Sequence, residues 1–127
     1  MFEQKETKYK VIKYTSESNK CPIDEYVGSL RKNGRLKDCA KIDHCIEMLK
    51  TFGHQLPLIN KSIAKKIDKD IYELRPLPHR IFYYDGKGCF VLLNSFEKKK
   101  NMTPKSEIKL AIKNANDYKR RNNGYNE

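Results

Sequence analysis

The spacing of hydrophobic residues along the chain predicts an α+β fold. Apolar and polar residues alternate over residues 8–15, as in a partly buried strand. Between residues 22 and 52 the apolar positions recur at helical spacing, and from about residue 63 the alternation returns. Because helices are grouped before strands instead of alternating with them, the pattern favours a mainly antiparallel sheet over a parallel, doubly wound one.

Two amphipathic helices with a short connection are predicted in the first half of the chain. The first begins at Pro22, which suits the first helical turn, and ends at Asn33 and Gly34. The second covers residues 36–52 and ends at Gly53. We expect the pair to form an αα-hairpin that packs on one face of the sheet. Their apolar stripes consist of Ile23, Tyr26, Val27 and Leu30, and of Leu36, Cys39, Ile42, Cys45, Ile46, Leu49 and Phe52.

Residues 71–96 are predicted to form three consecutive antiparallel strands. Three runs rich in β-branched and aromatic residues are separated by turn residues. Pro76 and Pro78 cannot donate ladder hydrogen bonds, so they lie between the first and second strands. Asp85 and Gly86 predict a hairpin between the second and third strands, because a glycine allows positive φ. Tyr83, Tyr84 and Phe96 are expected in the core.

The remaining segments complete a predicted order of β-α-α-β-β-β-α. Residues 56–62 are expected to be a loop broken by Pro57, and residues 63–67 a short edge strand or a linker. Thr103 and Pro104 predict the start of a carboxy-terminal helix whose apolar stripe covers residues 108–118. Residues 119–127 are polar and expected to fray. A chain of 127 residues is expected to form a single domain, residues 1–127.

The alternation along the predicted strands places charged residues on one face of the sheet. Glu73 and Arg75 share a face of the first strand of the meander, and Arg80 lies near the start of the second. A short connection would bring Arg75 and Arg80 close together. Whether the lysines at residues 98–100 join them depends on strand register, which the sequence leaves open.

The net charge adds a preference for a polyanionic partner. The chain has 27 Lys and Arg against 16 Asp and Glu, a formal charge of +11. This balance favours nucleic acid first and an acidic protein second. The first residues are charged and lack the apolar core of a signal peptide, and no apolar run approaches the roughly 20 residues that span a bilayer. We therefore expect a cytoplasmic protein without membrane contact.

The four cysteines do not have the spacing of a metal site. Cys21, Cys39, Cys45 and Cys89 form no C-x-x-C pair, and Cys45 falls on the apolar stripe of the second helix. We expect reduced, buried cysteines and no metal ion.

The ordered set of residues from the meander onward resembles the RelE/ParE toxin superfamily, and most closely its phage-derived HigB-like branch. The resemblance covers about residues 71–118, and the preceding β-α-α segment agrees as a pattern. It implies a RelE-like fold and a toxin of a toxin–antitoxin pair. The matching sequence is Leu-Arg75, four residues, Arg80-Ile-Phe-Tyr-Tyr, a glycine turn, Val-Leu-Leu-Asn-Ser-Phe96-x-Lys-Lys, then Thr103-Pro104 and Glu107-Ile108.

The resemblance also implies a reaction and roles for named residues. RelE and HigB toxins enter the ribosomal A site and cut mRNA by attack of the ribose 2′-OH on the adjacent phosphate, without metal or cofactor. Arg80 matches the phosphate-binding arginine, Arg75 the arginine that closes the preceding strand, and Lys99 a cation at the scissile phosphate. Planar guanidinium groups can hold two phosphate oxygens at once. Lys98, Lys100 and His79 are further candidate RNA contacts.

The general base is not identified by the sequence. At the positions of two RelE lysines this chain has Ile71 and Glu73, and Lys105 stands near the position of a RelE tyrosine. Glu73 is the first candidate base, although two arginine neighbours would lower its pKa. Lys99, crowded by other lysines, and His79 are the alternatives. A plain, exposed ion pair between Glu73 and Arg75 fits the sequence equally well.

Three functions remain open at this stage. The first is a ribosome-dependent endoribonuclease that acts on mRNA and is held by a cognate antitoxin, expected to be a helix-turn-helix protein encoded nearby. The second is a non-enzymatic inhibitor of gyrase, as in the ParE branch. The third is a phage-encoded nucleic-acid-binding protein without cleavage activity. The basic set at Arg75, Arg80 and residues 98–100 favours the nuclease.

Overall fold

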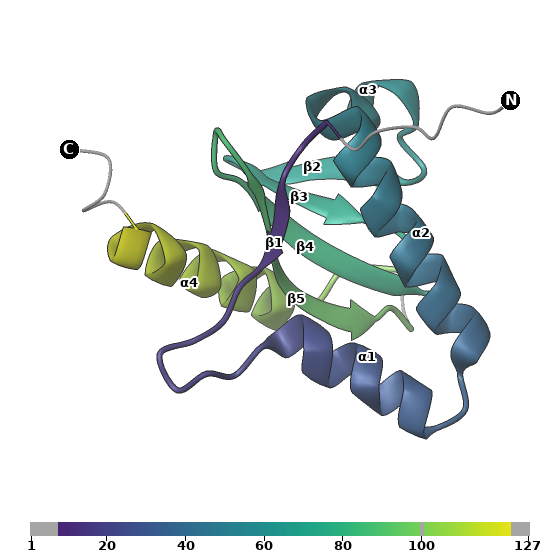
Figure 1. Cartoon of the computed structure of the whole chain (residues 1–127). Helices are drawn as coiled ribbons and strands as arrows, with labels where there is room; N and C mark the ends of the chain where they lie inside the picture. The colour runs from purple at the N-terminus through teal and green to yellow at the C-terminus, as the bar shows by residue number, and fades with distance from the viewer. Residues whose placement is uncertain (1–7, 100, 123–127) are drawn as a thin grey trace, which may run out of the picture.

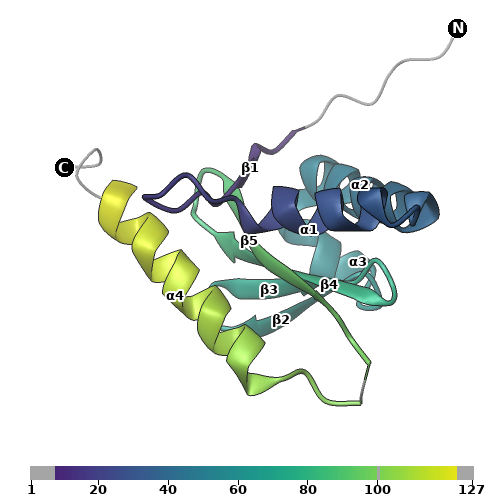
Figure 2. The same cartoon turned by 90° about the horizontal axis from the view of Figure 1, so that it is seen from below.

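The computed structural model describes residues 8–99 and 101–122, and its centre is one sheet with helices on both faces (Figure 1, Figure 2). The strands are β1 (Val11–Lys13), β2 (Ala64–Asp68), β3 (Ile71–Leu74), β4 (His79–Asp85) and β5 (Phe90–Glu97). The helices are α1 (Pro22–Lys32), α2 (Leu36–Phe52), the short 3-10 helix η1 (Gly53–Gln55), α3 (Leu56–Ile59) and α4 (Lys105–Asn122).

The sheet has the order β1-β5-β4-β3-β2, and all its neighbours are antiparallel except β1 and β5. The predicted meander is therefore confirmed, and so is the mixed α+β class with a mainly antiparallel sheet. A register shift between β4 and β5 places Phe82 opposite Asn94 but Tyr83 opposite Leu92. Glu73, Phe82 and Asn94 consequently form one row across three strands.

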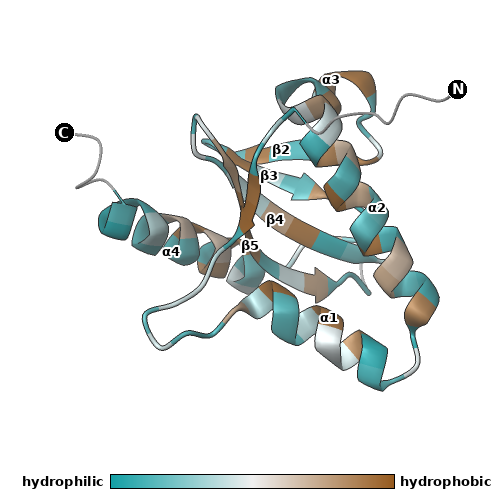
Figure 3. Cartoon of the chain, in the orientation of Figure 1, coloured by the Kyte–Doolittle hydropathy of each residue, from teal (hydrophilic) through white to brown (hydrophobic). Residues whose placement is uncertain are grey.

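The two faces of the sheet carry separate hydrophobic cores. Leu74, Ile81 and Tyr83 pack against α1 and α2, as the two apolar stripes predicted. The alternate residues Ile71 and Phe82 pack against α4 on the opposite face. Figure 3 shows hydrophobic residues along β4, between helices whose outer surfaces are mostly polar. Successive residues of β4 point to opposite faces of the sheet, and each face carries a hydrophobic core, so β4 is buried on both sides.

Side chains attach the carboxy-terminal part of α4 to the segment that follows β1. The hydroxyl of Tyr14 donates a hydrogen bond of 2.6 Å to Asp117. Arg121 bonds to the main-chain oxygen of Thr15, and its guanidinium also lies over the Tyr14 ring. The prediction that the chain frays from residue 119 is wrong for residues 119–122, because these contacts hold the last helical turn. Residues 123–127 lie outside the described part.

Three local predictions differ from the structure, and a fourth is settled between two alternatives. Residues 56–59 are helical, because Pro57 occupies the first turn of α3, where a proline is tolerated. Residues 64–68 form the edge strand β2, which confirms the first of the two alternatives predicted for this segment. With α3, the order contains one helix and one strand more than the predicted order. Leu36 is exposed at the start of α2, outside the apolar face. In the β4–β5 turn the residue with positive φ is Lys87, at 58°, and its N–H bonds to the Asp85 carboxylate.

A prediction on stability follows from the contact between η1 and the chain before β1. Gly53 has a φ of 50°, and a Cβ there would lie 2.5 Å from the ring of Tyr9. We expect Gly53→Ala to lower the free energy of unfolding by about 2 kcal/mol or more, from backbone strain and the steric clash. The matched control is Gly28→Ala in α1, where no atom lies within 4 Å. This change should raise the free energy of unfolding by about 0.5–1 kcal/mol. Urea unfolding of both variants tests the pair, and similar effects of the two substitutions would contradict it.

Candidate functional site

One buried carboxylate holds two arginines where β3 ends and β4 begins. Oε1 of Glu73 accepts a hydrogen bond of 2.8 Å from Nε of Arg75 and lies 3.5 Å from Nε of Arg80. Glu73 and Arg80 lie on the same face, because Glu73 is opposite Phe82 and Arg80 is two residues away from Phe82. The connection from β3 to β4 is short, so Arg75 and Arg80 lie close to each other. The structure thus brings Glu73, Arg75 and Arg80 together, in what we call the arginine cluster.

The arginine cluster is more buried than the sequence suggested. Glu73 is 1% exposed and Arg80 is 8% exposed, whereas the Arg75 side chain is 23% exposed. The expectation of an exposed pair between Glu73 and Arg75 is wrong, because the α4 side of the sheet is covered. Phe96, itself buried, lies directly opposite Arg80. Burial lowers the pKa of Arg80, and the Glu73 charge opposes this shift.

Several polar atoms around the arginine cluster lack a partner. Among the residues that the structure describes, Glu73 Oε2, Arg80 Nε and Asn94 Oδ1 are buried without a hydrogen-bond partner. Asn94 Nδ2 reaches the main-chain oxygen of Glu107 at 3.4 Å, which joins β5 to the first turn of α4. Burial raises the pKa of the Glu107 carboxyl, and the hydrogen bond from Asn94 opposes it. Buried polar groups normally find partners, so these atoms mark the polar part of an otherwise hydrophobic face.

Asn94 and Glu107 were not singled out as site residues from the sequence. The available signal for Asn94 was a polar residue inside the apolar run that precedes Phe96. Its place in one row with Phe82 and Glu73 depends on the register shift between β4 and β5, which no sequence pattern marks.

The lysines after β5 lie near the connection between β3 and β4. The N–H of Lys98 donates a hydrogen bond of 2.9 Å to the carbonyl of Pro78. Lys99 is exposed and is close enough to Glu97 to contribute to lowering its pKa, although the hydrogen bond from Arg35 is the main cause. No side-chain contact from Lys98 or Lys99 to the arginine cluster occurs within residues 8–99 and 101–122. Lys100 lies outside the described residues.

His79 is part of a buried network on the opposite face of the sheet. Its Nδ1 lies 2.6 Å from the hydroxyl of Tyr26, and its Nε2 lies 3.0 Å from Asp38. A carboxylate accepts, so Nε2 carries the hydrogen and Nδ1 accepts from the phenol. Asp38 also binds Arg35, which reaches Glu97 at 2.8 Å. The network therefore connects α1, α2, β4 and β5.

The network excludes one predicted role of His79 and indicates another. The side chain is fully buried, so it cannot contact RNA from this position, and the prediction of an RNA-binding His79 is wrong for this conformation. Its main-chain oxygen accepts a hydrogen bond of 3.2 Å from Arg80. His79 therefore fixes the start of β4 and positions Arg80.

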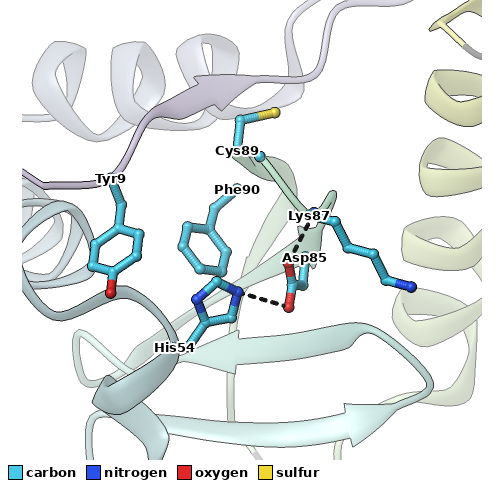
Figure 4. A pocket seen from close by; sticks show the side chains of 7 residues that line it. Tyr9, His54, Asp85, Lys87, Cys89 and Phe90 are labelled. Carbon is cyan, nitrogen blue, oxygen red and sulfur yellow. Dashed lines mark hydrogen bonds and ion pairs between the residues drawn. The ribbon is translucent and has the colours of Figure 1, made fainter. Parts of the chain in front are cut away.

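A separate cavity of about 380 Å³ lies at the other end of β4 (Figure 4). The rings of Tyr9, His54 and Phe90 line it, and Nε2 of His54 lies 3.1 Å from the Asp85 carboxylate. Asp85 is five residues from Arg80 along the strand, about 17 Å at the usual rise. The cavity is therefore distinct from the arginine cluster.

Comparison with protein families places the chain in a known family. A model of the family described as phage-derived protein Gp49-like (DUF891) matches residues 35–116, which is more than half of the chain. No curated protein matches the chain. Within the described residues no group of three acidic, histidine or cysteine side chains could hold a metal ion, and no helix could cross a membrane.

The geometry of the arginine cluster predicts unequal costs for its members. Glu73→Ala would leave Arg80 buried without its carboxylate, so we expect the free energy of unfolding to fall by about 3–5 kcal/mol. Arg75→Ala should cost only about 1–3 kcal/mol, since it removes one hydrogen bond to a charged group. The control is the double variant Glu73→Leu with Arg80→Met, which should be more stable than Glu73→Ala alone. Denaturant unfolding measures all three, and a Glu73→Ala variant as stable as Arg75→Ala would contradict the shared-carboxylate geometry.

Proposed function

The chain belongs to the family of phage-derived Gp49-like proteins, which is grouped with the RelE/HigB-like toxins, and we propose that it is a toxin that cuts mRNA on the ribosome. The observation that supports this function best is the arginine cluster on a strongly basic chain. The reaction would be attack of a ribose 2′-oxygen on the adjacent phosphorus. The 2′-hydroxyl loses its proton as its oxygen bonds to phosphorus, the bond from phosphorus to the 5′-oxygen breaks, and the 5′-oxygen takes up a proton, which leaves a 2′,3′-cyclic phosphate and a 5′-hydroxyl.

Arg75 is the group best placed to bind the phosphate. Its guanidinium is partly exposed, and its Nε is fixed on Glu73, so the remaining N–H groups are oriented before the substrate arrives. A positioned cation stabilises the charge of the phosphorane transition state without reorganisation. Arg80 lies behind it and keeps the local charge positive despite Glu73.

The three candidate bases are not equivalent in position. Glu73 is buried and bonded to Arg75, and His79 is enclosed by Tyr26 and Asp38. Lys99 is exposed, on the segment that follows β5. We therefore assign Glu73 to positioning Arg75, and we assign contact with the scissile phosphate to Lys99, with Lys98 and Lys100 as neighbouring cations.

The partners that fit this function are mRNA on the ribosome and a cognate antitoxin. An acidic or amphipathic antitoxin segment would complement the formal charge of +11, and a helix-turn-helix protein encoded nearby is the expected form.

One observation favours a second candidate function. The burial of Glu73 and Arg80 suits a nucleic-acid-binding protein that does not cleave.

The assignment of Arg75 predicts a loss of activity without loss of the fold. Arg75→Ala should reduce cleavage by about 10²–10³-fold, and Arg75→Lys should recover little, because the lysine lacks the bidentate fork. The measurements are growth arrest on induction and mapping of mRNA 5′ ends, with thermal melting of each purified variant.

The control for this test is Arg31→Ala, which removes an exposed arginine at the end of α1. It should remain fully toxic. If Arg75→Ala also remains toxic and folded, the assigned site is wrong. If the wild-type protein arrests growth or binds RNA without new mRNA 5′ ends, the non-cleaving function is supported instead.

A further inference from the structure

The edge strand β2 carries two adjacent lysines that point to opposite faces of the sheet. Lys65 lies directly opposite Glu73, and Lys66 lies directly opposite Tyr72. Side chains that face each other in an antiparallel pair lie on the same face, with their Cβ atoms about 4.5–5.5 Å apart. Lys65 therefore shares the face of the arginine cluster. Lys66 shares the face of Tyr72, whose ring stacks on Tyr83 in the core beneath α1 and α2.

Lys65 changes the charge that a ligand would meet at this face. Arg75 and Arg80 carry two positive charges, and Glu73 cancels one of them. Lys65 restores a net charge of two, and unlike Arg80 it is exposed. Neither Lys65 nor Lys66 has a side-chain partner among the residues that the structure describes. The ammonium group of Lys65 is therefore available to an anion held by Arg75.

We propose that Lys65 is a third cation of the site and binds the phosphate backbone of single-stranded RNA together with Arg75. This inference rests on the proposed function for the identity of the ligand. A lysine is a flexible point charge, so it can follow a phosphate whose position the rigid guanidinium has fixed.

The ordinary role of lysines on an edge strand is to prevent pairing with other strands. Lys65 and Lys66 both perform that role, since they are neighbours, both exposed and carry the same charge. They differ in the face to which they point. A comparison of Lys65→Ala with Lys66→Ala therefore separates phosphate binding from edge protection and from the general effect of losing one charge.

The experiment measures binding of the full chain to a short 2′-O-methyl oligoribonucleotide, which has no 2′-OH and cannot be cleaved. We expect Lys65→Ala to raise the dissociation constant about 10-fold at low salt and to reduce the salt dependence by about one phosphate contact. Lys66→Ala should change neither quantity by more than about 2-fold, as expected for a cation that makes no contact with the oligonucleotide. Lys65→Arg should retain affinity, and thermal melting checks that each variant is folded.

Several results would overturn the proposal. The first is an equal effect of Lys65→Ala and Lys66→Ala on the dissociation constant. The second is an unfolded Lys65→Ala together with a Lys65→Gln variant that binds as well as the wild type. The third is the absence of oligonucleotide binding by the wild type. An equal loss of affinity for a polyglutamate peptide would indicate an acidic protein partner instead. Because the probe is not cleaved, the binding difference can be present while mRNA cleavage in cells is absent. In that case the proposed nuclease function fails and the phosphate site remains.

Discussion

The structure depends on a carboxylate that is shared by two guanidinium groups inside the covered face of the sheet. Among the residues that the structure describes, Glu73 alone carries the negative charge that pairs with Arg75 and Arg80, and it is almost fully removed from water. A buried charge without a partner is strongly unfavourable, so each of the three residues constrains the other two. The same constraint prepares Arg75 for a ligand, because its remaining donors are held in a fixed direction.

The two faces of the sheet are linked through consecutive residues of β4. His79 points toward α1 and α2 and is fixed by Tyr26 and Asp38. Arg80 points toward the α4 side, and its guanidinium is bound by the carbonyl of His79. The helical hairpin therefore does more than cover a hydrophobic face. It fixes the main chain from which the arginine of the opposite face extends.

The elements were largely predictable from the sequence because they follow hydrophobic period and capping residues. The bounds of α2 and the three strands of the meander are examples. The meeting of Arg75 and Arg80 was predictable as well, since it requires only alternation and a short connection. The burial of Arg80, the alignment of Asn94 with Phe82 and the enclosure of His79 were not predictable. They depend on strand register and on side chains from α1 and α2, which lie far away in sequence.

The position of β1 has a consequence for the synthesis of the protein. Among the strands that the structure describes, β1 pairs with β5 alone, through partners such as Val11 and Phe90, and Tyr14, the residue after β1, bonds to Asp117. The first strand therefore has no sheet neighbour until most of the chain has been made. Contacts of such long sequence separation form late and slow the folding of a domain. The nascent chain consequently has an incomplete sheet while it is translated, because β1 has to wait for β5.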